Sequence, residues 1–289
     1  MIQSPLRAVA TSYGRALSSQ FSGKILLWSV IPFLLSLALW SGLLYAGFQP
    51  LLDYVQHAFE HYGGFQVSGS VLAAVGLGML KVVIVPLIAI LLLLPLMILT
   101  ALIFMGVAAM PAVVKHVSRR QFPTLELKRG GSFLGSLLTN ASGFLIFVVC
   151  WLLTLPLYLF APLALVAQIF LWGWLTSRVM SYDALADHAS PEERAELLRR
   201  HRVPLQVIGM VSGAFGALPG LVWIGGALSV ALFPFLAALS VWLYVMIFMF
   251  TGLWFVYYCL QALADLRAET AQVAVAPSPP SPSPPPSDA

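Results

Sequence analysis

Residues 22–37, SGKILLWSVIPFLLSL, open the uncharged stretch that decides the fold. No Asp, Glu, Lys or Arg lies between Lys24 and Asp53, and most side chains in between are apolar. A helix needs about 20 such residues to cross the hydrocarbon core of a bilayer. This stretch therefore predicts a membrane span at about residues 25–48.

Three more uncharged runs follow along the chain, and the last two are each long enough to cross a membrane twice. The whole chain is 60% hydrophobic and only 9% charged, whereas a soluble domain carries about 25% charged residues. We therefore predict an all-α integral membrane protein without a separate soluble domain. Its six apolar helical segments are expected at about 25–48, 82–113, 133–155, 158–177, 205–230 and 236–262.

The basic residues gather in alternate gaps between these runs. The first 24 residues carry three cations and no acid, and the gaps at 115–132 and 178–202 each hold five Lys or Arg residues. The gap at about 49–70 carries acids but no Lys or Arg. Because positive loops stay cytoplasmic, we expect both termini and both basic loops to face the cytoplasm and the 49–70 loop to face outward.

Two expected turns, at Pro156–Pro162 and Phe233–Pro234, carry no charge. They fit short external loops, and they fit equally the tips of helical hairpins that enter from the cytoplasm and turn back within the membrane. The positive-inside rule does not separate these alternatives. The first span begins only after residue 24 and is longer than the apolar core of a signal peptide, so we expect an uncleaved span.

Short flanking segments complete the organisation. Residues 4–20 read as an amphipathic helix lying in the cytoplasmic interface. Residues 190–202 read as a second short helix, because Ser190 and Glu193 form a capping box. A Pro/Ser-rich tail cannot build a core and is expected to be disordered. The predicted domains are 1–24, the interfacial helix; 25–265, the helical membrane domain; and 266–289, the disordered tail.

Small residues within the last uncharged run predict a tight helix contact. Gly209 and Gly213 form a small-xxx-small pair, and such pairs allow two helices to approach closely. We interpret this pair as a packing feature, with a bent helix lining a pathway as the alternative.

The apolar runs lack the residues that membrane enzymes and pumps use. They contain no Asp or Glu, and all five histidines lie in loops or interfacial segments. A membrane haem needs axial ligands within helices, a metalloprotease needs a metal site, and a carboxylate-coupled pump needs an acid near the midplane. We therefore expect no enzyme activity, no cofactor and no metal. The net charge of +4 comes from the loops and is explained by topology, without nucleic-acid binding.

Basic groups at the cytoplasmic ends of the apolar runs are the candidates for ligand contact. Gly23 and Lys24 stand at the start of the first span, where backbone N–H groups and a nearby cation suit an anion. Arg178, which closes the third run on the same side, is a second candidate. Simple anchoring of Lys24 by the positive-inside pattern is the alternative interpretation.

The order of these pieces resembles the CysZ-like family, which includes the eukaryotic etoposide-induced membrane proteins. The stretch at 22–37, LLLLPL at 91–96, and SRVMSYDALADHASPEERAELLRRHR at 177–202 carry the resemblance, above all Tyr182-Asp183. The resemblance implies two long spanning helices, two hairpins that penetrate only partway, and a homo-oligomer. Bacterial members are associated with sulfate entry for cysteine synthesis, and their anion-binding turn corresponds here to Gly23-Lys24.

These observations lead to one expected function and two alternatives. We expect a bacterial inner-membrane channel or permease for a small oxyanion, with sulfate as the substrate. The alternatives are a non-transporting membrane scaffold and an accessory subunit of a larger transporter complex. The expected partners are the lipid bilayer, a small inorganic anion and further copies of the chain.

Overall fold

The computed structural model describes residues 5–61, 93–94, 96–128, 130–216, 218 and 232–275. Within these ranges the regular structure is entirely helical, which confirms the predicted all-α class. Five helical stretches in the described part of the chain are long and apolar enough to cross a membrane: Gly23–Gly47, Leu96–Gln121, Leu134–Leu153, Pro162–Leu185 and Phe235–Gln272.

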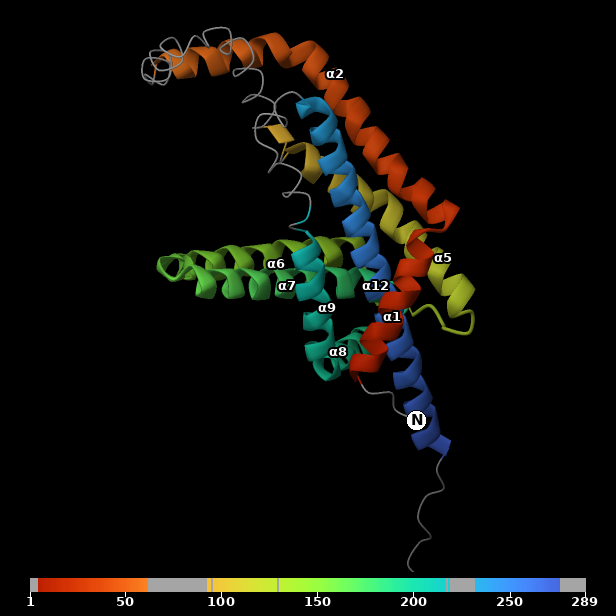
Figure 1. Cartoon of the computed structure of the whole chain (residues 1–289). Coiled ribbons are helices and arrows are strands. Elements are labelled where there is room, and N and C mark those ends of the chain that lie inside the picture. The colour runs from red at the N-terminus through yellow and green to blue at the C-terminus, as the bar shows by residue number, and fades with distance from the viewer. Residues whose placement is uncertain are drawn as a thin grey trace, which may run out of the picture.

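Figure 1 shows the described helices along the chain. In chain order they are α1 (Pro5–Gln20), α2 (Gly23–His61), the π-helical segment η2 (Met105–Ala109), α5 (Met110–Gln121), α6 (Phe133–Leu153), the 3-10 segment η3 (Leu155–Leu159), α7 (Ala161–Leu185), α8 (Pro191–Arg200), α9 (Arg202–Phe215) and α12 (Phe233–Val275).

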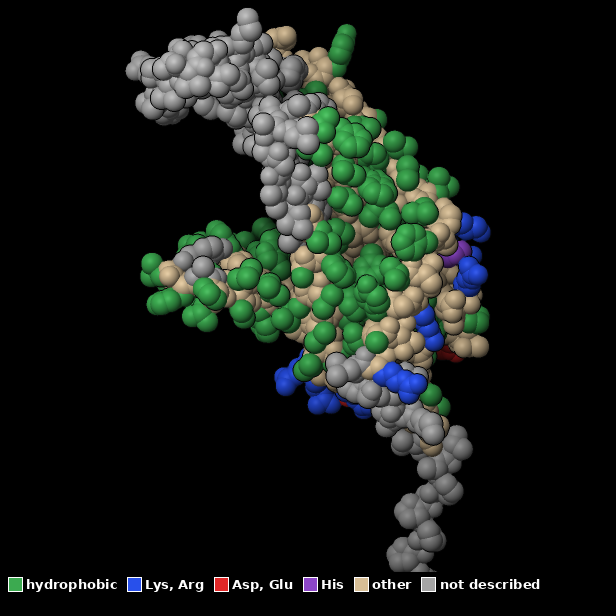
Figure 2. Space-filling view, in the orientation of Figure 1, with side chains coloured by type: hydrophobic (Ala, Val, Ile, Leu, Met, Phe, Trp, Pro, Cys, Tyr) green, Lys and Arg blue, Asp and Glu red, His purple; other side chains and the backbone are tan. Residues whose placement is uncertain are grey.

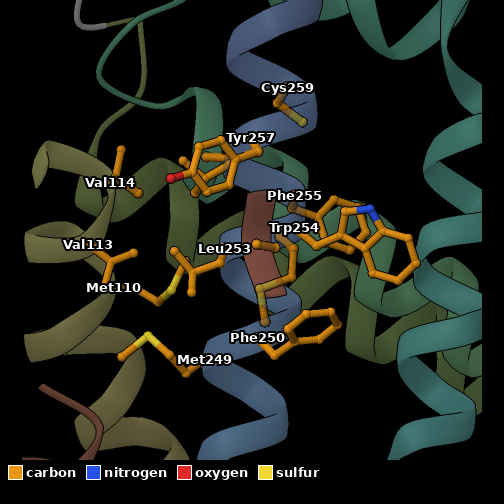
Figure 3. Close-up of a cluster of buried hydrophobic side chains, with 14 of the residues drawn as sticks. Met110, Val113, Val114, Met249, Phe250, Leu253, Trp254, Phe255, Tyr257 and Cys259 are labelled. Atoms are coloured by element: carbon orange, nitrogen blue, oxygen red, sulfur yellow. The ribbon is translucent and has the colours of Figure 1, made fainter. Parts of the chain in front are cut away.

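Helix α12 is the centre of the molecule. Its 43 residues give a length of about 65 Å, and α1, α2, α5, α7, α8 and α9 all contact it. In its middle, every residue from 251 to 260 is buried. Figure 3 shows side chains of α5, among them Met110 and Val113, facing Met249 and Leu253 of α12. A Cβ on Gly252 would lie 2.5 Å from Met110 Sδ, so a glycine lets the two helices approach this closely.

Helix α1 packs its apolar face on α12. The Tyr13 ring lies 5.3 Å from the Phe250 ring and 4.9 Å from the Trp254 ring, edge to face in both cases. Trp254 Nε1 donates to Val9 O and to Ser12 Oγ, each at 3.1 Å. The predicted helix at 4–20 is therefore present, and the face expected to meet the bilayer surface covers α12.

Helices α6 and α7 form a hairpin that projects to one side of α12 (Figure 1). The turn lies where the uncharged Pro156–Pro162 segment predicted it. At this end Leu153 is 72% exposed, Leu159 85% and Phe160 66%. Figure 2 shows that the projecting hairpin carries mainly hydrophobic side chains. Such a surface is stable only where lipid or another protein covers it.

Several helix ends differ from the predicted boundaries. Helix α2 continues to His61, so the first part of the expected 49–70 loop is helical. Helix α12 continues to Val275, beyond the predicted start of the tail at residue 266. The first part of the predicted segment at 205–230 is helical and belongs to α9, which ends at Phe215. The predictions for 82–92, for 219–230 and for the end of the tail lie outside the described residues.

Candidate functional site

The first turn of α2 holds the predicted anion contacts. Helix α1 ends at Gln20, and α2 starts at Gly23. The N–H groups of Ile25 and Leu26 both donate to Ser22 O at 3.0 Å. Gly23 and Lys24 thus stand ahead of the first helical bonds, where N–H groups have no partner within the helix. Both residues are exposed, and a Cβ on Gly23 would meet nothing within 4 Å. The turn is therefore open to a ligand.

The basic end of α5 lies next to the beginning of α2. The rings of Trp28 and His116 meet edge to face, with 5.5 Å between their centroids. Lys24 is one helical turn from Trp28, and Arg119 and Arg120 are one turn from His116. In Figure 2, Lys and Arg side chains and a histidine gather at the right-hand border of the apolar surface.

We call the set Lys24, Lys115, His116, Arg119 and Arg120 the basic edge. Its four Lys and Arg side chains are exposed. None of the ion pairs in the described ranges includes them. The two Arg residues lie in the last turn of α5, where cations complement the helix dipole. The basic edge therefore offers uncompensated positive charge beside the open turn at Gly23 and Lys24.

Arg178, the other predicted site residue, lies elsewhere. Its Nη2 donates to Ser142 Oγ at 3.4 Å, and its guanidinium carbon is 5.7 Å from the Trp174 ring centre. Its Nε is buried without a hydrogen-bond partner in the described part of the protein. All these contacts belong to the α6–α7 hairpin, and no described hydrogen bond or ion pair joins Arg178 to Gly23 or Lys24. The structure therefore does not bring the three predicted residues into one site.

The Tyr182-Asp183 pair is part of a tight junction with the start of α6. Ser136 Oγ donates to Asp183 Oδ1 at 2.7 Å. The ring of Tyr182 lies 4.4 Å from the Arg194 guanidinium carbon. A Cβ on Gly135 would lie 2.2 Å from the Tyr182 hydroxyl. The pair that carried the family resemblance thus fixes the base of the α6–α7 hairpin.

A partly buried ion-pair network joins α8 to α12. Arg267 donates to both carboxylate oxygens of Glu193, at 2.9 and 3.0 Å, and to His188 O at 2.6 Å. Lys128 Nζ donates to Glu193 Oε1 at 2.6 Å. Arg267, with help from Lys128 and the Ser190 N–H group, lowers the pKa of Glu193 to about 2. The sequence alone does not pair Arg267 with Glu193, because the two residues lie 74 positions apart.

Metal ligands do not gather in the described residues: no three His, Cys, Asp or Glu side chains there come close enough to hold a metal ion. Cys150 and Cys259 are both free thiols.

One comparison with known proteins identifies the family of this chain. The family model described as sulfate transporter CysZ/etoposide-induced protein 2.4 matches residues 12–225. This match includes the turn at Gly23 and Lys24, the α6–α7 hairpin and the Tyr182-Asp183 junction. No curated protein and no solved structure matches the chain. Since the family model covers well over half of the sequence, the chain belongs to the sulfate transporter CysZ/etoposide-induced protein 2.4 family.

Proposed function

We propose that this protein is a channel or permease for a small oxyanion, with sulfate as the substrate. The observation that carries the proposal is the open turn at Gly23 and Lys24 beside the basic edge. Free N–H groups at a helix start attract anions, and cations without ion pairs raise the local concentration of an anion. The sulfate-transporter description of the family supports this choice.

In this proposal the protein moves the anion across the membrane without changing it chemically. The basic edge attracts an anion to the start of α2. The N–H groups of Gly23 and Lys24 then replace part of the hydration shell of the anion. The uncharged run from Ile25 to Leu52 presents no carboxylate that would repel the anion. We place the protein in a bacterial inner membrane as a homo-oligomer, with its basic loops and both termini in the cytoplasm.

A non-transporting scaffold is the second candidate, and a specific observation favours it. The resemblance implies more than one basic residue at the anion-binding turn, but Lys24 is followed by Ile25 and Leu26, and Ile25 is only 1% exposed. A side chain buried in this way belongs to the core and cannot bind an anion. A scaffold would embed the apolar α6–α7 hairpin in the membrane and would carry no solute.

Replacing Lys24 tests the proposed site in proteoliposomes. Lys24→Ala removes one charge-assisted contact, so sulfate uptake below saturation is expected to fall about tenfold. Arg202→Ala is the matched control, because Arg202 is also an exposed cation at a helix start but lies on α9. Equal uptake by Lys24→Ala and wild type, at equal amounts of inserted protein, would remove the turn at Gly23 and Lys24 from the proposal.

A further inference from the structure

A pocket outside the proposed anion site lies between α1, the α8–α9 junction and α12. Its volume is about 450 Å³, which lies within the range of small-molecule sites. Four of its lining residues carry full charges: Arg15 from α1, Arg200 from α8, and Asp265 and Glu269 from α12. Three segments that are distant in sequence therefore converge on one polar hollow.

The four charges of this pocket are not equally satisfied. Arg200 Nη1 pairs with Glu269 Oε2 at 2.9 Å, and Arg200 also pairs with Glu196. Arg15 and Asp265, by contrast, belong to none of the ion pairs that the structure describes. One cation and one anion of the pocket are thus without an ion-pair partner among the described residues.

A single side chain, Gln261, links these two charges. Arg15 Nη1 donates to Gln261 Oε1 at 3.3 Å, and Gln261 Nε2 donates to Asp265 Oδ1 at 3.0 Å. The carboxamide therefore presents an acceptor to the cation and a donor to the anion. A zwitterion with adjacent carboxylate and ammonium groups offers the same two functions with full charges, and charge-assisted hydrogen bonds are about twice as strong as neutral ones.

We propose that this pocket binds a free α-amino acid, whose carboxylate takes the place of the Gln261 carbonyl at Arg15 and whose ammonium group takes the place of the Gln261 amide at Asp265. The remaining space accommodates the amino-acid side chain beside Tyr257 and Tyr258, which also line the pocket. This binding goes beyond the proposed transport of an oxyanion.

The charge balance of the pocket selects a zwitterion over an inorganic anion. Two Arg residues face two acids, which gives a formal charge of zero. Burial and the neighbouring Arg200 lower the pKa of His201, which also lines the pocket, so this side chain adds no charge at pH 7. A bare oxyanion would gain Arg15 but would also be repelled by Asp265. The basic edge and this pocket therefore suit different ligands.

The position of Arg15 connects the pocket to the anion site. Helix α1 leads into α2 after two residues, and Arg15 lies on the α1 turn before Gln20. A ligand that joins Arg15 to Asp265 fastens α1 more firmly to α12. It thereby stabilises the element that positions Gly23 and Lys24.

Isothermal titration of the purified full-length protein in detergent with L-alanine tests this inference. Wild type is expected to bind L-alanine with a Kd in the millimolar range. Gln261→Ala removes the competing amide and is expected to tighten binding severalfold. Asp265→Asn removes the ammonium partner and is expected to weaken binding at least tenfold. Thr270→Ala, which changes an exposed residue of α12 outside the pocket lining, is the control and should match wild type.

Controls on the ligand separate a zwitterion site from weak ion binding. Acetate and methylammonium each carry one half of the zwitterion, and each is expected to bind more than tenfold more weakly than L-alanine. The inference is overturned if neither wild type nor Gln261→Ala gives saturable heat with L-alanine. It is equally overturned if Asp265→Asn binds like wild type, or if only an ethanolamine phospholipid gives saturable heat. Because the assay measures no flux, its result is independent of the proposed transport function.

Discussion

At the scale of single residues, contacts between glycine backbones set how closely the helices pack. A Cβ on Gly209 of α9 would lie 2.2 Å from Gly173 O of α7, whereas the nearest atom to a Cβ on Gly213 is 3.6 Å away. The small-xxx-small pair at 209 and 213 predicted a close helix approach, and the structure confirms it. Of the two glycines, Gly209 makes the closer contact.

Replacing Gly209 by alanine is therefore expected to push α9 away from α7. Overpacking of this kind costs about 1–3 kcal/mol, so Gly209→Ala should lower the thermal unfolding midpoint in detergent. Gly213→Ala adds the same methyl group one turn away and should leave the midpoint nearly unchanged. Equal midpoints for the two variants would contradict the described α7–α9 contact.

The ion pair of Glu193 predicts that the folded protein loses stability in acid. Its pKa falls from 4.5 to about 2 on folding, chiefly through the hydrogen bonds from Arg267. A lowered pKa contributes stability that is fully present above 4.5 and is lost as the pH falls from 4.5 to about 2.

The Glu193→Gln variant should therefore be less stable than wild type at pH 7, and the difference should shrink between pH 4.5 and pH 2. Glutamine can still accept from the Ser190 N–H group in the capping box, so the variant mainly removes the charge. Unfolding midpoints measured across this pH range are the test. A difference that stays constant with pH would show that the ion pair with Arg267 is not formed.

At the scale of elements, the attachment of α1 to α12 depends on the indole of Trp254. Trp254→Phe keeps an aromatic ring but loses the donor to Val9 O and Ser12 Oγ, which costs about 1–2 kcal/mol. The variant is expected to expose α1, so that trypsin cleaves after Arg15 severalfold faster in detergent. Trp172→Phe, on the α6–α7 hairpin, is the control. Unchanged cleavage of Trp254→Phe would mean that other contacts hold α1.

The depth of the α6–α7 hairpin is a second question at this scale. The family resemblance implies that the hairpin penetrates only partway from the cytoplasm, and its exposed tip carries no charge. We therefore expect Leu159→Cys, in a chain with both native cysteines replaced, to resist an impermeant maleimide added to intact cells. Tyr54→Cys, in the segment expected to face outward, should be labelled. Labelling of both positions would show that the hairpin spans the membrane.

At the scale of the whole molecule, the sequence predicts the structural features that depend on residues close together in the chain. Uncharged runs identified the apolar helices, and the Ser190–Glu193 capping box predicted the start of α8, where both of its hydrogen bonds are present. Contacts between distant segments could not be predicted in this way. The charge of Arg178 indicated the cytoplasmic side of the membrane. Its hydrogen bond to Ser142, however, depends on the packing of α6 against α7. Arg267 and Glu193 meet for the same reason, through packing of α8 on α12.

The proposed function requires that the purified protein moves sulfate. The most direct measurement is uptake of radiolabelled sulfate into proteoliposomes, with empty liposomes alongside and folding verified by a cooperative unfolding transition. A sulfate permease should give uptake that saturates with sulfate concentration and is inhibited by a similar oxyanion. Uptake by folded protein equal to that of empty liposomes would contradict the proposed function and would favour the scaffold function.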